Sequence, residues 1–124
     1  MEAETFVPGA AAGLAPALAS PEHLARWAPD LVLHPWDDRG EEGVRAVVSG
    51  VLVGRVEWWL ERVEVPPGVH VHFWLAATPT GDGRRRPRRA GWLQRRHQRL
   101  LLQAHLRRWQ AALRGLADQL PQDR

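Results

Sequence analysis

One pair of histidines has a spacing that could serve a metal site. His70 and His72 lie two positions apart, so a strand would place both rings on the same face. Glu57 or Glu61 of a neighbouring strand could add a carboxylate ligand. No third histidine is fixed nearby, and an exposed face with cross-strand Glu–His pairs fits the same residues. We therefore predict no metal site here.

His105 is the histidine whose position best suits acid–base catalysis. It falls in a predicted C-terminal helix, one turn before Trp109, where it could reach a hydrophobic interior. A capped or half-exposed helix histidine is the interpretation that the position favours. The chain has no cysteine, which excludes thiolate chemistry, and it shows no Ser-His-Asp arrangement, phosphate loop or zinc-helix motif. We predict no catalytic residue and no cofactor, and leave open whether the protein is an enzyme.

The charge is divided unevenly along the chain. Residues 1–82 hold 5 Arg and 12 acidic residues, whereas residues 83–124 hold 12 Arg and 2 acidic residues. A cluster that could bind an anion or a charged partner consists of Arg84, Arg85, Arg86, Arg88 and Arg89. All 17 basic residues are arginine, as in GC-rich genomes, so arginine content alone says little about anion binding, and a solvated loop that balances the acidic sheet is the favoured explanation of the cluster. We expect this loop, residues 79–91, to be mobile.

Hydrophobic periodicity and capping residues predict the elements that position these groups. The sequence predicts strands at 4–8, 31–34, 44–49, 51–65 and 69–78, and helices at 11–19, 20–27 and 88–120. Ser20 and Pro21 are typical of a helix start, and Pro35 and Pro121 of element ends. The 124 residues predict one domain. The uncharged stretch 5–21 has acidic residues before it and internal prolines, so we expect a cytoplasmic protein and no signal peptide.

Alternation assigns the side chains of the predicted hairpin 51–78 to two faces. The inward set is Val56, Trp58, Leu60, Val69, Val71, Phe73 and Leu75. The outward set is Glu57, Trp59, Glu61, His70, His72 and Trp74. Because no layer is predicted over the outer face, we expect Trp59 and Trp74 to contact a partner, such as a second copy in a homodimer, or to be shielded by their neighbours.

Five segments together resemble the START-like, or SRPBCC, helix-grip superfamily, which includes polyketide cyclases and lipid-transport proteins. These segments are residues 4–8, 20–29, 54–61, 68–74 and 105–109, and the resemblance covers nearly the whole chain. It implies an α+β fold in which a curved antiparallel sheet of about five or six strands, with two short N-terminal helices, wraps one long C-terminal helix. The chain is shorter than such proteins by about one hairpin, at residues 37–43.

The resemblance implies a cavity between the sheet and the C-terminal helix that binds a hydrophobic small molecule, such as a lipid or a polyketide. Its expected lining is Trp27, Val56, Trp58, Leu60, Val71, Phe73, Leu75, Leu102, His105, Leu106, Trp109 and Leu113. Packing of the same aromatic residues into a solid core is the alternative. A different function is also open: a non-catalytic interaction protein that uses the arginine-rich segment 84–99 on RNA, a ribosome or an anionic membrane.

Overall fold

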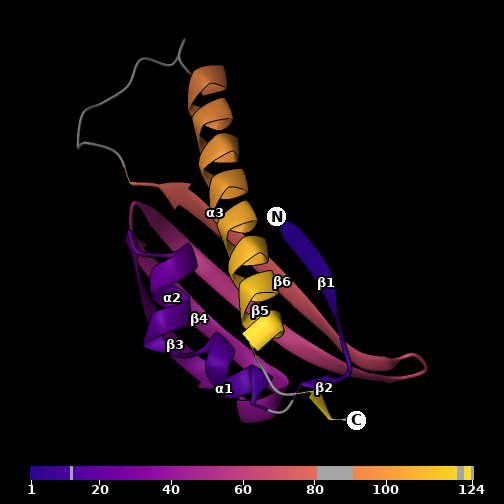
Figure 1. Ribbon diagram of the computed structural model, residues 1–124. Helices are drawn as coiled ribbons and strands as arrows, with labels where there is room; N and C mark the ends of the chain where they lie inside the picture. The colour runs from indigo at the N-terminus through magenta and orange to yellow at the C-terminus, as the bar shows by residue number, and fades with distance from the viewer. Residues whose placement is uncertain (12, 81–90, 120–121, 124) are drawn as a thin grey trace.

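The computed structural model describes residues 1–11, 13–80, 91–119 and 122–123, and its elements are labelled in Figure 1. They are β1 (Glu2–Pro8), β2 (Ala10–Ala11), α1 (Leu14–Leu18), α2 (Pro21–Trp27), β3 (Leu31–Asp38), the 3₁₀ helix η1 (Gly40–Glu42), β4 (Gly43–Gly50), β5 (Leu52–Glu64), β6 (Pro67–Pro79), α3 (Gly91–Gln119) and β7 (Gln122–Asp123). The predicted α+β class, with short N-terminal helices and a long C-terminal helix, is confirmed.

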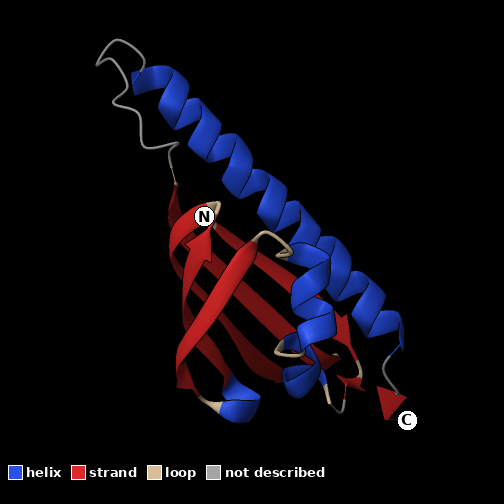
Figure 2. Ribbon diagram, turned by 90° about the vertical axis from the view of Figure 1, so that its left-hand side faces the viewer, coloured by secondary structure: helices blue, strands red, loops and turns tan. Residues whose placement is uncertain are grey.

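Five strands form one antiparallel sheet in the order β1-β6-β5-β4-β3, and β2 pairs with β7 in a separate two-stranded sheet. The helices α1, α2 and α3 lie on the same side of the five-stranded sheet (Figure 2). We call that side the inner face and the opposite side the outer face. The first turns of α3 extend beyond the sheet, as both ribbon views show.

The long hairpin of β5 and β6 follows the predicted alternation. Val56 pairs with Leu75 and Trp58 pairs with Phe73, and all four side chains are buried on the inner face. The outward residues are half-buried or exposed. A period of two, which brings alternate residues to one face, was therefore a sufficient signal for this part of the fold.

The two short helices begin where backbone geometry allows. The Ser20 hydroxyl accepts a hydrogen bond from the backbone N–H of His23 at 3.2 Å, and Pro21 occupies the first turn, so the predicted start of α2 is confirmed. The predicted start of the first helix at residue 11 was wrong. Gly13 has φ of 82°, in the left-handed region, so the helix begins only at Leu14.

Strand β3 is longer than predicted. We expected Pro35 to end it, yet it continues to Asp38. The strand lies at an edge of the sheet, where a missing N–H is tolerated, and its pairing with β4 shifts register between Pro35 and Asp37. The shift lets the chain pass the proline and resume pairing before η1.

Helix α3 covers the inner face with the predicted side chains. Leu102, Trp109 and Leu113 are buried, and Leu106 and Leu116 are half-buried. Residues 88–90 and 120 of the predicted helix, like most of the predicted loop at 79–91, lie outside the described residues. Among the helices that are described, none has the length and apolar character needed to cross a membrane.

Candidate functional site

Three aromatic rings fill the interior beneath α3. The ring of Trp109 stacks on Phe73 of β6, with centroids 4.4 Å apart and planes 25° apart. Trp27 of α2 meets Phe73 edge to face at 5.4 Å and 87°. All three side chains are buried. This region has the close packing of a hydrophobic core.

The residues predicted to line a ligand cavity are distributed mainly through this core. Ten of the twelve are buried: Trp27, Val56, Trp58, Val71, Phe73, Leu75, Leu102, His105, Trp109 and Leu113. Leu60 and Leu106 are half-buried. The structure thus brings the predicted residues together, but most of them pack against one another in the core. Their contact with a ligand stays a prediction.

A cavity of about 280 Å³ lies on the inner face beside α1, toward the end of the long hairpin. Of the predicted lining, Leu60 borders it. The full set of lining residues is Gly13, Leu14, Ala15, Pro16, Glu41, Glu42, Leu60, Arg62 and Val69. These residues come from α1, η1, β5 and β6 and from the residue before α1.

Small side chains explain why space remains here. Helix α1 has five residues, and it presents Ala15 and Pro16 where α3 presents tryptophan and leucine. Leu14 is buried and anchors the helix, while Leu60 and Val69 provide an apolar wall on the sheet. Sequence reasoning missed the cavity because a gap depends on side-chain volume across two packed elements. The one available signal was the presence of Gly13 just before this helix and of Pro16 within it.

The mouth of the cavity carries both signs of charge. Arg62 continues the inward set of β5, and Glu41 and Glu42 belong to η1; all three side chains are exposed. No ion pair joins them in the described part of the chain. These groups therefore remain able to hydrogen-bond a polar group at the mouth.

His105, the predicted acid–base candidate, is held between two oxygen atoms. Its side chain is fully buried, with Nδ1 2.8 Å from the carbonyl oxygen of Leu101 and Nε2 2.9 Å from Oδ1 of Asp30. Asp30 precedes β3, and its second oxygen lies 3.6 Å from Arg108. The pair links α3 to the segment between α2 and β3. Neither residue lines the cavity beside α1, and both ring nitrogens are engaged, so the geometry supports a structural role.

The charge state of Asp30 follows from this arrangement. Burial alone would raise the pKa of its carboxyl group. The hydrogen bond from His105, together with the charges of His105 and Arg108, outweighs that effect and lowers the pKa below its ordinary value. The carboxylate is therefore ionised at neutral pH and available to hold His105.

His23 is the second buried histidine and differs in its surroundings. Neither ring nitrogen has a hydrogen-bond partner among the described residues, and the same holds for Nε1 of Trp27, one turn later in α2. Burial, with the nearby charge of Arg26, lowers the pKa of His23 to about 4. The ring is neutral at pH 7. Sequence reasoning did not single out this residue.

The outer face carries the remaining histidines of the hairpin. His72 lies 3.2 Å from Glu61 and stacks on Trp59, with centroids 4.9 Å apart and planes 8° apart. The predicted Glu–His pairing is confirmed there. His70 instead lies 2.8 Å from Glu4 of β1.

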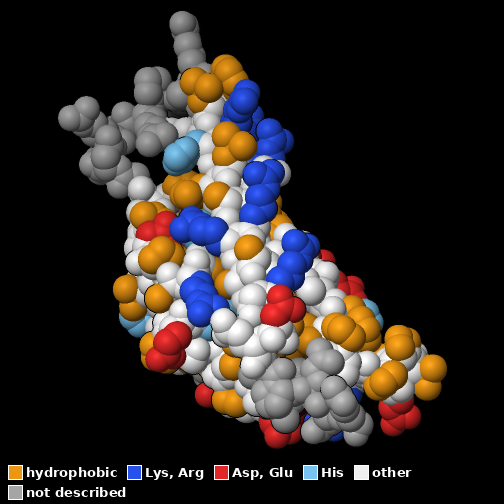
Figure 3. All heavy atoms as spheres, in the orientation of Figure 1, with side chains coloured by type: hydrophobic (Ala, Val, Ile, Leu, Met, Phe, Trp, Pro, Cys, Tyr) orange, Lys and Arg blue, Asp and Glu red, His pale blue; other side chains and the backbone are white. Residues whose placement is uncertain are grey.

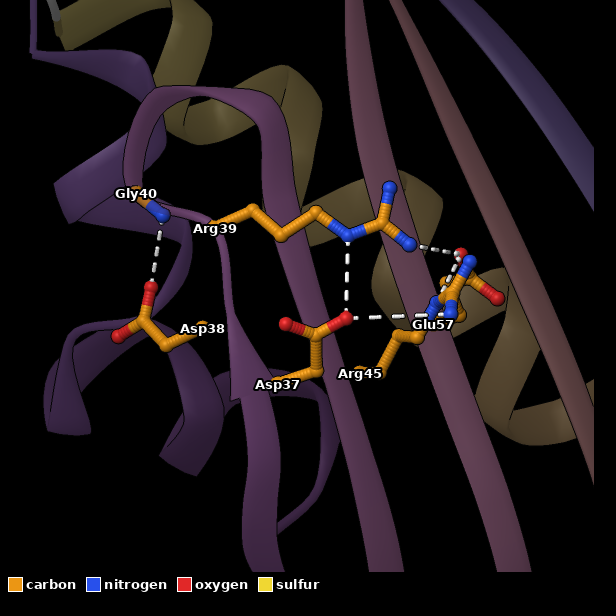
Figure 4. A network of polar contacts seen from close by, with 6 residues as sticks. All are labelled: Asp37, Asp38, Arg39, Gly40, Arg45 and Glu57. Carbon is orange, nitrogen blue, oxygen red and sulfur yellow. Dashed lines mark hydrogen bonds and ion pairs between the residues drawn. The ribbon is translucent and has the colours of Figure 1, made fainter.

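Glu57 does not pair with a histidine. It pairs with Arg45 of β4, and Nε of Arg45 lies 2.9 Å from Oε1 of Glu57 (Figure 4). The predicted homodimer residues Trp59 and Trp74 are both half-buried.

Arginines follow α3 along its exposed side (Figure 3). The predicted anion-binding residues 84–89 lie outside the described residues, but Arg95, Arg96 and Arg99 are exposed next to Trp92 and form an open hollow with it. Asp118 is the one acidic residue of α3.

The sequence matches no known protein family model and no curated protein.

Proposed function

We propose that this protein binds a small hydrophobic molecule, lipid-like or polyketide-like, in the cavity beside α1. The observation that carries the proposal is a cavity of about 280 Å³ on the inner face of the sheet, with Leu14, Leu60 and Val69 in its wall. Known ligand sites are mostly apolar hollows of about 300–1,000 Å³, so this cavity, just below that range, suits a small ligand. The assignment of this chain to the helix-grip superfamily is part of the same proposal.

The mouth indicates the polar part of the ligand. Arg62 is a hydrogen-bond donor, whereas Glu41 and Glu42 are acceptors when ionised. A uniformly anionic ligand would meet the two glutamates, and a uniformly cationic ligand would meet the arginine. A neutral polar end with hydroxyl or carbonyl groups satisfies both. We therefore propose an apolar body with an uncharged polar end.

The test is binding of an uncharged, environment-sensitive fluorescent dye, followed by native mass spectrometry of the protein as purified. The variant Leu60→Trp introduces a large ring into the cavity and should reduce dye affinity more than tenfold. Leu100→Trp is the matched control, because Leu100 is 51% exposed on α3 and is not among the residues that line the cavity. It should bind the dye as the wild type does.

Two results would contradict the proposal. One is a folded wild-type protein that binds no uncharged apolar probe. The other is equal loss, or equal retention, of dye binding in Leu60→Trp and Leu100→Trp. If the dye binds but only Trp109→Phe changes its affinity, the ligand occupies the interior beneath α3 instead.

We propose polyanion binding by α3 as a second candidate function. What favours it is the exposed group of Trp92, Arg95, Arg96 and Arg99 on a helix with a single acidic residue. Arginine neutralises phosphates, and an indole ring can stack on a base or enter a membrane interface. The partner would be RNA, a ribosome or an anionic membrane, as for the arginine-rich segment 84–99.

Retention on RNA and on anionic vesicles, measured against salt concentration, tests this candidate. The triple variant Arg95→Gln, Arg96→Gln and Arg99→Gln should flatten the salt dependence. Arg26→Gln, an exposed residue of α2, is the control and should leave it almost unchanged. Salt-independent retention, or an equal effect of both changes, contradicts the proposal.

A further inference from the structure

The outer face of the sheet, which no helix covers in the described part of the chain, carries exposed apolar side chains among its charged and polar ones. Val32 and Trp36 of β3 are each 56% exposed, Val47 of β4 is 40% exposed and Val53 of β5 is 47% exposed. An antiparallel sheet with one solvated face ordinarily carries polar residues there. Exposed apolar groups on adjacent strands indicate a surface that is covered by a partner.

Fixed charges lie beside this apolar surface. Asp37, Arg45 and Glu57 are in register across β3, β4 and β5. Nε of Arg39 lies 3.1 Å from Asp37, and Nε of Arg45 lies 2.9 Å from Glu57 (Figure 4). Arg55, two residues before Glu57 on the same face, makes no ion pair with any described residue. The face thus holds an unpaired cation next to an anchored anion.

The two exposed surfaces of the molecule differ in their capacity to bind a copy of themselves. The exposed side of α3 is almost wholly positive, so two such helices would repel each other. The outer face contains both signs at fixed positions together with apolar side chains. A two-fold dimer requires one surface to be complementary to itself, and the outer face meets this condition.

Register defines how two outer faces would match. The row of Glu57 and Trp74 lies next to the row of Arg55 and Ala76. A two-fold axis that lies in the interface, perpendicular to the strands and between these rows, exchanges them. Arg55 then lies opposite Glu57 of the second copy, twice in the dimer. The same rotation places Ala76 opposite Trp74 of the second copy.

We propose that the outer face binds a second copy of this chain, sheet against sheet, about a two-fold axis that crosses β5 between Arg55 and Glu57. The rotation also places Val53 opposite Trp59 of the second copy. Apolar pairs therefore flank the charged pairs. Aligned packing of two sheets, with inner side chains interdigitated, is an established architecture.

The area of the face is sufficient. Strands β5 and β6 have 13 residues each, and β1, β3 and β4 have 7 or 8. At ~3.3 Å per residue and about 4.8 Å between neighbouring strands, each residue covers about 16 Å². The five strands together offer a surface on the order of 800 Å², similar to the area that each partner buries in a standard interface, about 800 Å².

Sedimentation equilibrium over a range of protein concentrations tests the proposal. The wild type should approach twice the 14.0 kDa mass of one chain as concentration rises. Arg55→Glu should weaken the dimer about 100-fold, because it creates two like-charge contacts. Val53→Glu, which places a charge against an aromatic ring, should weaken it similarly. Arg114→Glu, on the exposed side of α3, is the control and should leave dimerisation unchanged.

Mixing two charge-reversal variants gives a sharper test. Arg55→Glu and Glu57→Arg should each be monomeric alone, yet their mixture should form a heterodimer, because both inter-subunit contacts are then of opposite sign. Circular dichroism confirms that each variant folds. A wild type that is monomeric at every concentration overturns the proposal. So does a dimer that Arg114→Glu dissociates, or one that tolerates both Arg55→Glu and Val53→Glu.

Discussion

The inner face of the sheet is covered in two different ways along its length. Beneath α3, three large rings from three elements occupy the interior: Trp27, Phe73 and Trp109. Beside α1, the same face keeps a cavity of about 280 Å³ between Leu60 and a five-residue helix. The strands are continuous through both regions, so the difference comes from the volume of the side chains that face each other across the sheet and the helices. Large rings on both sides close the region beneath α3, whereas smaller side chains leave space beside α1.

The difference between the two regions assigns stability to the packed region beneath α3 and ligand binding to the cavity beside α1. Removing atoms from a closely packed region lowers the free energy of unfolding, so the packing beneath α3 fixes the position of that helix. A region with unfilled volume tolerates changes in side-chain size and has room for a ligand. If this division is correct, substitutions beneath α3 should act on stability, and substitutions beside α1 should act on ligand affinity.

Trp109→Ala should have the largest effect on stability. The ring is 1% exposed and stacks on Phe73, so its loss should lower the free energy of unfolding by about 3–5 kcal/mol. Urea denaturation followed by circular dichroism measures this change. Trp92→Ala on the same helix is the control and should cost less than about 1 kcal/mol, because Trp92 is 60% exposed. Similar costs at both positions would refute a packed interior beneath α3.

His23 of α2, next to the packed region, predicts that the stability of the protein depends on pH. An unfolded histidine binds its proton near pH 6.5, whereas folded His23 has a pKa of about 4. The unfolded state therefore holds more protons between these values, and the free energy of unfolding should fall by about 3 kcal/mol as pH drops from about 6.5 to about 4.

His23→Leu should remove this pH dependence and leave the protein at least as stable at pH 7, because the two unpartnered nitrogens are lost. Denaturation at pH 7, 5.5 and 4.5 in both proteins is the measurement. A wild-type stability that does not change with pH over this range would show that the ring is solvated or paired. Leu24→Ala, a change in the same helix that removes no titratable group, is the control and should alter stability by the same amount at all three pH values.

Much of the packed region could be predicted from sequence, and the cavity could not. Alternation places Val56, Trp58 and Phe73 inward because a strand has only two faces. The start of α2 follows from the Ser20 cap, a local interaction. Pro35 misled the prediction of β3 because its tolerance depends on the edge position of that strand, which is a property of the whole sheet.

The candidate site depended on relations that periodicity does not encode. The cavity arises from volumes on α1, η1 and the sheet, which are distant in sequence. The Asp30–His105 contact spans 75 residues, so neither residue alone indicates it. Alternation gave the outward direction of Trp59 but not its stacking on His72.

His105→Leu tests the polar link within the packed region. The change removes the hydrogen bond to Asp30 and should lower stability at pH 7 by about 2 kcal/mol. Because the pKa of Asp30 is held below its ordinary value, 3.8, its contribution should be present above that pH and disappear as pH falls through the lower, folded value.

The stability difference between wild type and His105→Leu should therefore narrow in acid. A difference that stays constant from pH 7 to pH 2.5 would contradict the ionic part of this link. Arg107→Leu, an exposed change nearby on α3, is the control and should show no such narrowing.

The smallest effect is expected from Leu60→Ala, and the same truncation at Leu113 gives the comparison. Leu113 is fully buried beneath α3, so Leu113→Ala should cost about 2–5 kcal/mol. Leu60 is half-buried and already borders a cavity, so its truncation should cost about 1 kcal/mol. Dye affinity is measured without denaturant, at a temperature where both variants are folded. It should change in Leu60→Ala and stay constant in Leu113→Ala. Equal stability losses at the two leucines would mean that the space beside α1 is filled in solution.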